Sequence, residues 1–186
     1  MKRILLVDNY DSFTYNLAHY LEGLDCDVIT EYNDKTDLDR LSEYDAVVLS
    51  PGPGLPSEAG LMPEIIKICI GDIPLLGVCL GMQGMAEYLG GEMYNQQVVK
   101  HGVEEVIDVF DSVLFEGVGD SMNVGLYHSW AVFEHGDFDV VARSKSKTVM
   151  AIQNEALQCY GVQFHPESVM TPKGKMVLKN FLRTIK

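Results

Sequence analysis

The amino-acid sequence predicts an α/β protein in which a mostly parallel, doubly wound central sheet has helices on both faces. Up to Glu92, short apolar runs alternate with longer segments of helical periodicity, which is typical of parallel strands joined by helices. The runs are apolar throughout, as expected of strands that are covered on both faces. Beyond Glu92, shorter alternating segments predominate, and these predict a small antiparallel addition to the sheet.

The expected elements of the first half follow one another along the chain. Strands and helices alternate as Ile4–Val7, Phe13–Leu24, Val28–Tyr32, Thr36–Glu43, Ala46–Leu49, Met62–Ile70, Leu75–Val78 and Met82–Leu89. Asp11 or Ser12 is expected to cap the first helix, because a side-chain oxygen there can accept a free N–H group. Thr36 with Asp39 is expected to cap the second helix. Gly90 is expected to end the last one.

The second half is predicted to hold strands at Val103–Val109, Val140–Arg143, Val149–Gln153 and Leu157–Phe164, and a helix at Lys175–Thr184. No repeat, linker or low-complexity segment divides the chain, so residues 1–186 are expected to form a single domain. Ligands of parallel sheets bind outside the carboxyl ends of the strands. Because Ser50–Gly54 and Cys79 both follow such ends, we expect them to border one crevice.

Composition narrows the class of function. The formal net charge is −13, which disfavours a nucleic-acid partner because phosphate binding needs clustered Lys and Arg. The four cysteines are widely spaced and include no C-x-x-C pair, which predicts a reducing, cytoplasmic location and no metal site. The apolar run after Lys2 and Arg3 is too short for a signal peptide, and no run approaches the length of a membrane span.

The segment Gly77-Val78-Cys79-Leu80-Gly81 has the G-x-C-x-G pattern of a nucleophile elbow. The chain would leave a strand, turn sharply at Cys79 and enter a helix. Glycine is expected on either side, because a Cβ there would obstruct the close approach of strand and helix. The helix N-terminus favours a thiolate, and the Leu80 N–H would face an oxyanion. A lone cysteine after a buried strand is, however, more often a packing residue.

The segment Cys159–Ser168 supplies the groups that a cysteine nucleophile needs. Alternation predicts a strand here, and its period places His165 and Glu167 on one face. Pro166 between them is expected to hold the pair in a stiff, extended arrangement. Alone, His165 could be a strand-end residue bonded to a carbonyl, and Glu167 an exposed carboxylate. Together with the elbow, the two predict a catalytic triad of Cys79, His165 and Glu167.

Five segments resemble a known family. Gly77–Gln83 and Gly161–Ser168 are similar to the signatures of the class I, or triad, glutamine amidotransferases. The opening segment Asp8–Leu17, with Ser50–Gly54 and Tyr127–Trp130, resembles the chorismate-linked branch of that family. That branch comprises the glutaminase components of anthranilate synthase and aminodeoxychorismate synthase. The resemblance covers essentially the whole chain and implies the class I amidotransferase fold.

The resemblance also implies a function. It implies a glutaminase that releases ammonia from L-glutamine through a glutamyl thioester, with no metal or organic cofactor. The N–H groups of Gly52 and Leu80 would form the oxyanion hole. Substrate contacts would come from Gly52, Pro53, Gly54, Gln83, Ser129 and Trp130. The ammonia would pass to a chorismate-using synthase subunit in a hetero-complex, for tryptophan synthesis by anthranilate synthase, for folate synthesis by aminodeoxychorismate synthase, or for both.

Three other interpretations remain open. A glutaminase serving carbamoyl phosphate, guanylate or imidazole synthesis is disfavoured by the opening segment. A cysteine peptidase on a related fold is disfavoured by Gln83 and the Pro-Gly-Pro-Gly loop, and a non-catalytic scaffold by the intact triad. The sequence also departs from the family pattern at Met82, Val103, Leu126 and Trp130, which leaves partner contacts and fine substrate positioning open.

Overall fold

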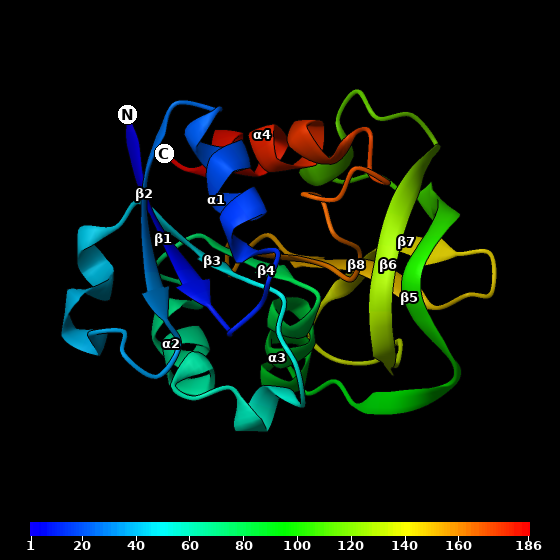
Figure 1. Cartoon of the computed structure of the whole chain (residues 1–186), viewed down its shortest axis with the longest axis horizontal. Helices are drawn as coiled ribbons and strands as arrows, with labels where there is room; N and C mark the ends of the chain where they lie inside the picture. Colours follow the sequence, from blue (N-terminus) through cyan, green and yellow to red (C-terminus); the bar gives the residue numbers. More distant parts are fainter.

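The computed structural model describes residues 1–186 and contains one nine-stranded sheet with helices on both faces (Figure 1). The strands lie in the order β2-β1-β3-β4-β9-β8-β7-β5-β6. From β2 to β9 the neighbouring strands are parallel, and every pairing beyond β9 is antiparallel. The predicted α/β class, with a mostly parallel sheet and an antiparallel addition, is confirmed.

The parallel half consists of β1 (Lys2–Asp8), β2 (Cys26–Tyr32), β3 (Ala46–Leu49), β4 (Leu75–Val78) and β9 (Cys159–Val162). Successive residues of a strand point to opposite faces of the sheet. In β1, Ile4 and Leu6 therefore pack in one hydrophobic core, and Leu5 and Val7 pack in the other. This burial on both faces is the reason that the strand sequences are apolar throughout.

Two pairs of helices cover these faces. Helices α1 (Thr14–Glu22) and α4 (Gly174–Thr184) pack on one side, and α2 (Met62–Cys69) and α3 (Leu80–Tyr88) pack on the other (Figure 1). Short 3₁₀ helices occupy Leu38–Glu43, Pro56–Glu58 and Val113–Phe115. None of the helices combines the length and the apolar character that crossing a membrane would require.

The antiparallel half consists of β5 (Met93–Val109), β6 (Ser121–Val132), β7 (Asp139–Ser144) and β8 (Val149–Asn154). Strands β5 and β6 form a long hairpin, which joins the rest of the sheet through the pairing of Ile107–Val109 with β7. The hairpin reaches back to the end of the parallel half, where the Gly125 carbonyl of β6 accepts the His165 N–H at 3.1 Å.

The hairpin is the largest departure from the predicted elements. Strand β5 begins at Met93, ten residues before the expected start at Val103, and strand β6 was not predicted at all. The segment Tyr127–Trp130 lies in β6. Met122, Val124, Leu126 and His128 are buried and alternate with exposed or partly exposed residues, except at Gly125, so the period of a strand is present in this sequence and β6 could have been predicted.

The predicted caps at the starts of two helices differ in detail from those observed, whereas Gly90 follows the end of α3 with φ +82°, as expected. Phe13 occupies the N-cap position of α1 and makes no side-chain capping bond, while the Asp11 carboxylate accepts the Phe13 N–H at 2.7 Å in the preceding turn. The segment expected to form the second helix is a 3₁₀ helix, and its cap is Asp37, whose carboxylate accepts the Asp39 N–H at 3.1 Å. Asp11 was one of the two residues expected to cap the first helix, and its carboxylate does satisfy an N–H group there, whereas Asp37 lies one residue after the expected Thr36.

Candidate active site

Cys79 lies in the turn that joins β4 to α3. Its φ and ψ angles are 53° and −104°, a conformation that is costly for a residue with a side chain. Hydrogen bonds hold this backbone on both sides. The Cys79 N–H donates to the Val162 carbonyl at 2.8 Å, and the Cys79 carbonyl accepts the Gln83 N–H at 3.0 Å. The structure therefore contains the predicted sharp strand–turn–helix elbow.

The glycines that flank Cys79 are required by close backbone contacts. A Cβ added to Gly77 would lie 2.4 Å from the carbonyl carbon of Gly81. A Cβ added to Gly81 would lie 2.6 Å from the carbonyl oxygen of Leu49. Helix α3 can thus start directly against β3 and β4 only because both positions lack side chains.

His165 and Glu167 lie beyond the end of β9, in a turn. The Ser168 N–H donates to the His165 carbonyl at 3.1 Å, and Pro166 takes the second position of this turn, which its fixed φ suits. The expected extended arrangement is wrong, because β9 ends at Val162. The turn still directs the two side chains together: His165 Nδ1 and Glu167 Oε1 are 2.7 Å apart, and both residues are buried.

The backbone of this turn is fixed by hydrogen bonds to β6 and to the loop before α4. The His165 N–H donates to Gly125, and the Thr171 hydroxyl donates to the His165 carbonyl at 2.7 Å. The same hydroxyl accepts the Gly125 N–H at 2.9 Å. The first residue of α4 presses on the turn, since a Cβ on Gly174 would lie 1.8 Å from the Pro166 carbonyl oxygen. Three separate elements therefore set the position of the imidazole.

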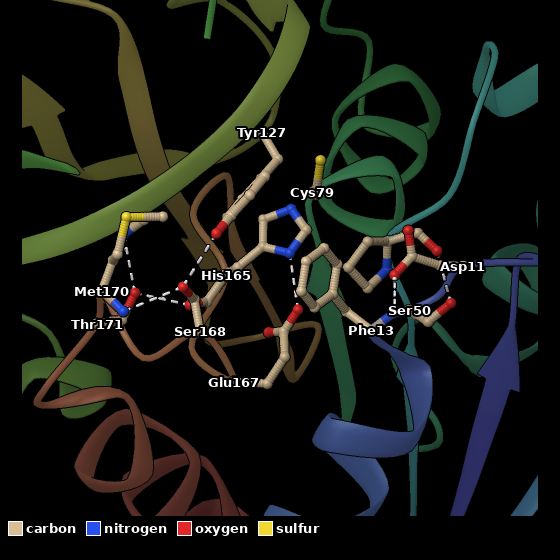
Figure 2. Close-up of polar contacts among 12 residues, drawn as sticks. Asp11, Phe13, Ser50, Cys79, Tyr127, His165, Glu167, Ser168, Met170 and Thr171 are labelled. Atoms are coloured by element: carbon tan, nitrogen blue, oxygen red, sulfur yellow. Dashed lines mark hydrogen bonds and ion pairs between the residues drawn. The ribbon is translucent and has the colours of Figure 1, made fainter. Parts of the chain in front are cut away.

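Two aromatic rings flank the imidazole of His165 (Figure 2). The centroid of Phe13 lies 5.6 Å from that of His165, and the centroid of Tyr127 lies 4.8 Å away, both at steep angles. Such edge-to-face contacts favour one ring orientation. No local pattern in the sequence indicates these contacts, because the three rings come from the β1–α1 loop, β6 and the turn after β9.

The imidazole lies between Glu167 and Cys79. Its Nδ1 edge faces Glu167 and its opposite edge faces Cys79 (Figure 2), and the buried Nε2 has no hydrogen-bond partner. Burial disfavours the imidazolium, but the neighbouring Cys79 sulfur and the Glu167 carboxylate outweigh burial and raise the pKa of His165 to about 10. A pKa this far above 7 makes His165 a cation at neutral pH, beside the Cys79 sulfur (Figure 2).

A pocket of about 200 Å³ opens beside Cys79. Its lining comprises Gly52, Pro53, Gly54, Cys79, Gln83, Tyr127, His128, Ser129 and Trp130. All the residues that were predicted to contact substrate are in this set. The volume is below that of pockets for drug-sized ligands and suits a ligand of amino-acid size. A larger hollow of about 570 Å³, near Asp111 and Gln153, contains none of the predicted site residues.

The loop after β3 is held against the loop after β1 and the start of α3. The Asn9 N–H donates to Ser50 Oγ, and the Asn9 side-chain amide donates to the Ser50 carbonyl, each at 2.8 Å. A Cβ on Gly52 would lie 2.6 Å from the Asn9 carbonyl oxygen and 2.9 Å from the Leu80 side chain. Leu80 is the first residue of α3, and the first N–H groups of a helix have no acceptor within it. Gly52 and Leu80, the residues predicted to supply the oxyanion N–H groups, are thus neighbours.

Gln83 reaches across the pocket from α3 to β6. Its Nε2 donates to the Trp130 carbonyl at 3.1 Å. His128 Nδ1 donates to the same carbonyl at 2.8 Å. Trp130 therefore bonds within the site through its backbone, which any residue could supply.

A family model described as glutamine amidotransferase class-I matches residues 5–185. The chain belongs to this family. Among curated relatives, it is 41% identical to the aminodeoxychorismate/anthranilate synthase component 2 of Bacillus subtilis (strain 168), over 97% of this chain and 96% of the relative. It is 40% identical to the aminodeoxychorismate synthase component 2 of Escherichia coli (strain K12), over 96% of this chain and 98% of the relative. It is 36% identical to the anthranilate synthase component 2 of Cyanophora paradoxa, over 98% of this chain and 99% of the relative.

Solved structures show the same fold. A crystal structure of a GMP synthase subunit from Thermoplasma acidophilum superposes with a TM-score of 0.90 at 26% identity, covering 100% of this chain and 94% of that one. A glutamine amidotransferase from Thermotoga maritima superposes with a TM-score of 0.79 at 19% identity, and the match covers 100% of this chain and 98% of that one. The expected class I amidotransferase fold is thereby confirmed, and the chain is a glutamine amidotransferase.

Two of the departures from the family pattern are buried in this amidotransferase. Met82 and Leu126 are 0% exposed, and a Cβ on Gly161 would lie 2.6 Å from Met82 Cγ. Neither side chain can touch a partner directly, so any effect they have on one must act through packing. Val103 is different, because it is partly exposed on β5, where it pairs with Leu126.

Proposed function

We propose that this chain is the glutaminase subunit of anthranilate synthase, which hydrolyses L-glutamine and passes the ammonia to a chorismate-using synthase subunit for tryptophan synthesis. The alternative is the equivalent subunit of aminodeoxychorismate synthase, serving folate synthesis, or one subunit that serves both. The observation that carries the proposal is the buried His165–Glu167 pair, 2.7 Å apart, beside a cysteine in a strained elbow at the mouth of a small pocket.

The arrangement supports hydrolysis of an amide in two steps. The Cys79 thiolate attacks the side-chain carbonyl of glutamine, and the oxyanion forms near the N–H groups of Gly52 and Leu80. The His165 imidazolium gives its proton to the departing ammonia, which leaves a glutamyl thioester on Cys79. His165, now neutral, takes a proton from water as the water attacks the thioester, and glutamate and the thiolate are released. Glu167 orients the imidazole through Nδ1 and stabilises its cation.

The pocket lining is suited to glutamine. Both N–H bonds of the Gln83 side chain are committed within the protein, to Trp130 and to Gln163 at 3.1 Å each. Its carbonyl oxygen is the group left to accept a hydrogen bond from the α-ammonium of the substrate. The lining residues Ser129 and Trp130 would bond the α-carboxylate and α-amino groups, partly through the backbone.

The names of the relatives support a hetero-complex, and they include both anthranilate synthase and aminodeoxychorismate synthase. Each of the three is named as component 2 of a synthase, and the two most identical of them differ by one percentage point. Ammonia made by a separate subunit must reach its acceptor before it is lost to water, which favours a tight complex with a component 1 synthase subunit.

The test is identification of the product by mass spectrometry. The chain is mixed with candidate chorismate-using subunits from the same genome, chorismate, Mg²⁺ and glutamine. Anthranilate that depends on glutamine and disappears with Cys79→Ser supports the proposal, whereas aminodeoxychorismate supports the alternative. If active synthase subunits give neither product and glutamine is untouched, the proposal fails. Failure of a glutamine-mimicking electrophile to label Cys79 would then favour a non-catalytic scaffold.

A further inference from the structure

A second glutamine, Gln163, contacts the candidate nucleophile. It is completely buried and follows β9 directly, two residues before His165. Its Nε2 lies 3.5 Å from Cys79 Sγ, within hydrogen-bond distance for sulfur. Its Oε1 accepts the Gln83 Nε2 at 3.1 Å. The side chain thus connects the nucleophile to the wall of the pocket.

The direction of these hydrogen bonds is set by a backbone carbonyl. The Trp130 carbonyl can only accept, so the Gln83 group beside it must be the NH₂. That same NH₂ faces Gln163, whose adjacent atom must then be the carbonyl oxygen. The NH₂ of Gln163 is consequently the group turned toward the sulfur. The hydrogen-bond network alone therefore sets the orientation of both amides.

We propose that Gln163 is a positioning residue that holds Cys79 Sγ and stabilises its thiolate, as the last donor of a chain that runs from the Trp130 carbonyl through Gln83. A buried NH₂ group is expensive to leave unpartnered. A neutral thiol is a weak acceptor, whereas hydrogen bonds to a charged group are about twice as strong as neutral ones. The contact therefore favours the anion over the thiol. It also ties the nucleophile to β6, the strand that carries Ser129 and Trp130.

The test is the rate at which iodoacetamide alkylates Cys79, followed by peptide mass spectrometry as a function of pH. Gln163→Met keeps the bulk of the side chain and removes the donor. We expect alkylation near pH 7 to fall about tenfold, because one hydrogen bond to a charged group is lost. Near pH 10, where most thiols ionise without help, the rate should stay within about twofold of wild type.

A second variant and a matched control separate positioning from packing. Gln163→Glu keeps an acceptor for Gln83 but places a carboxylate beside the sulfur, so it should lower the neutral rate at least as much as Gln163→Met. Gln153→Met removes another buried glutamine, which accepts from Ser112 at 2.6 Å and does not line the Cys79 pocket. This control should leave the alkylation profile unchanged.

The outcomes are decisive without any glutamine turnover. The inference rests on the proposed function only because it takes Cys79 as the nucleophile. Alkylation of Cys79 needs neither glutamine nor a partner subunit. A chain without glutaminase activity would therefore still show whether Gln163 changes the alkylation rate. Selective loss at neutral pH in both Gln163 variants supports the role. Wild-type rates in both variants, an equal loss at both pH values, or the same selective loss in Gln153→Met would overturn it.

Discussion

The two halves of the sheet contribute to the site in different ways. The parallel half supplies Cys79 and the Gly52 loop from turns in which backbone meets backbone at distances that exclude even one methyl group. The hairpin β5–β6 supplies one wall of the pocket from strands that are largely exposed along β5 and join the sheet at one end. The nucleophile is thus placed by rigid packing, whereas the wall that faces it lies on β6, whose hairpin partner β5 is largely exposed.

This difference suggests where a partner subunit could act. Packed cores change between discrete arrangements and resist small adjustments, while an exposed hairpin can shift at little cost. His165 spans both regions: its turn follows β9, but its N–H and one face of its ring contact β6. A movement of the hairpin would therefore displace the imidazole and the Trp130 carbonyl more than it would displace the elbow at Cys79. Four predictions test this contrast.

The largest effect is expected at the elbow. Gly77→Ala would place a methyl group 2.4 Å from the Gly81 carbonyl carbon and 2.5 Å from the Met82 nitrogen, and backbone atoms cannot move aside as side chains can. We expect the free energy of unfolding to fall by about 3 kcal/mol or more. Urea denaturation of the two proteins measures the difference.

Gly90→Ala is the matched control for this substitution. Gly90 has φ +82°, and no atom lies within 4 Å of an added Cβ, so the change costs only the strain of a left-handed residue, about 1 kcal/mol. Equal losses for Gly77→Ala and Gly90→Ala would mean that close packing at the elbow does not set its stability.

The second prediction concerns the pH dependence of stability that arises from the buried His165. Its pKa in the folded protein is raised to about 10, above the ordinary value of about 6.5 in an unfolded chain. A raised pKa means that the folded state binds the proton more tightly. The resulting stabilisation is complete below about pH 6.5 and disappears as the pH rises to about 10.

The measurement compares unfolding free energies of wild type and the double variant His165→Gln, Glu167→Gln at several pH values. The double variant is used because removing His165 alone would leave the buried Glu167 carboxylate without its hydrogen-bond partner. The stability advantage of wild type should shrink by about 2 kcal/mol between pH 6.5 and pH 10. A constant difference over this range would show that His165 is not held as a cation.

The contrast between the halves also explains what the sequence could predict. The elbow is local: Gly77, Cys79 and Gly81 lie within five residues, and the physical need for each glycine can be stated without the fold. The pairing of His165 with Glu167 was predicted, but its geometry was not, because the Ser168 N–H closes a turn where alternation indicated a strand.

Strand β6 was missed although Met122, Val124 and Leu126 recur at every second position, as in a strand with one buried face. Its place beside the site could not be predicted, because that depends on its pairing with β5 and not on local pattern. The contact of Tyr127 with His165 depends on how the hairpin curves back over the sheet, and the contact of Phe13 depends on the loop between β1 and α1. The helix bounds of the first half were close to those observed, because they depend on periodicity and turn residues within a few positions of one another.

The third prediction removes the hairpin's contact with the imidazole. Tyr127→Leu keeps an apolar side chain in β6 but deletes the ring that lies 4.8 Å from His165. We expect glutamine turnover, measured with the partner subunit, to fall about tenfold as the ring of His165 gains freedom. Tyr127→Phe should cost much less, since the hydroxyl contacts Ser168 Oγ only at 3.4 Å. Similar losses for both would assign the effect to the hydroxyl.

The smallest effect is expected on the exposed strand of the hairpin. Val103 is 37% exposed on β5 and is one of the four departures from the family pattern. In Val103→Lys, the long side chain can extend into water, so the free energy of unfolding should change by less than about 0.5 kcal/mol. Glutamine turnover by the isolated chain should also be unchanged, whereas turnover with the synthase subunit would change if β5 faces that partner. A stability loss as large as that of Gly90→Ala would contradict the view that the hairpin tolerates change better than the parallel half does.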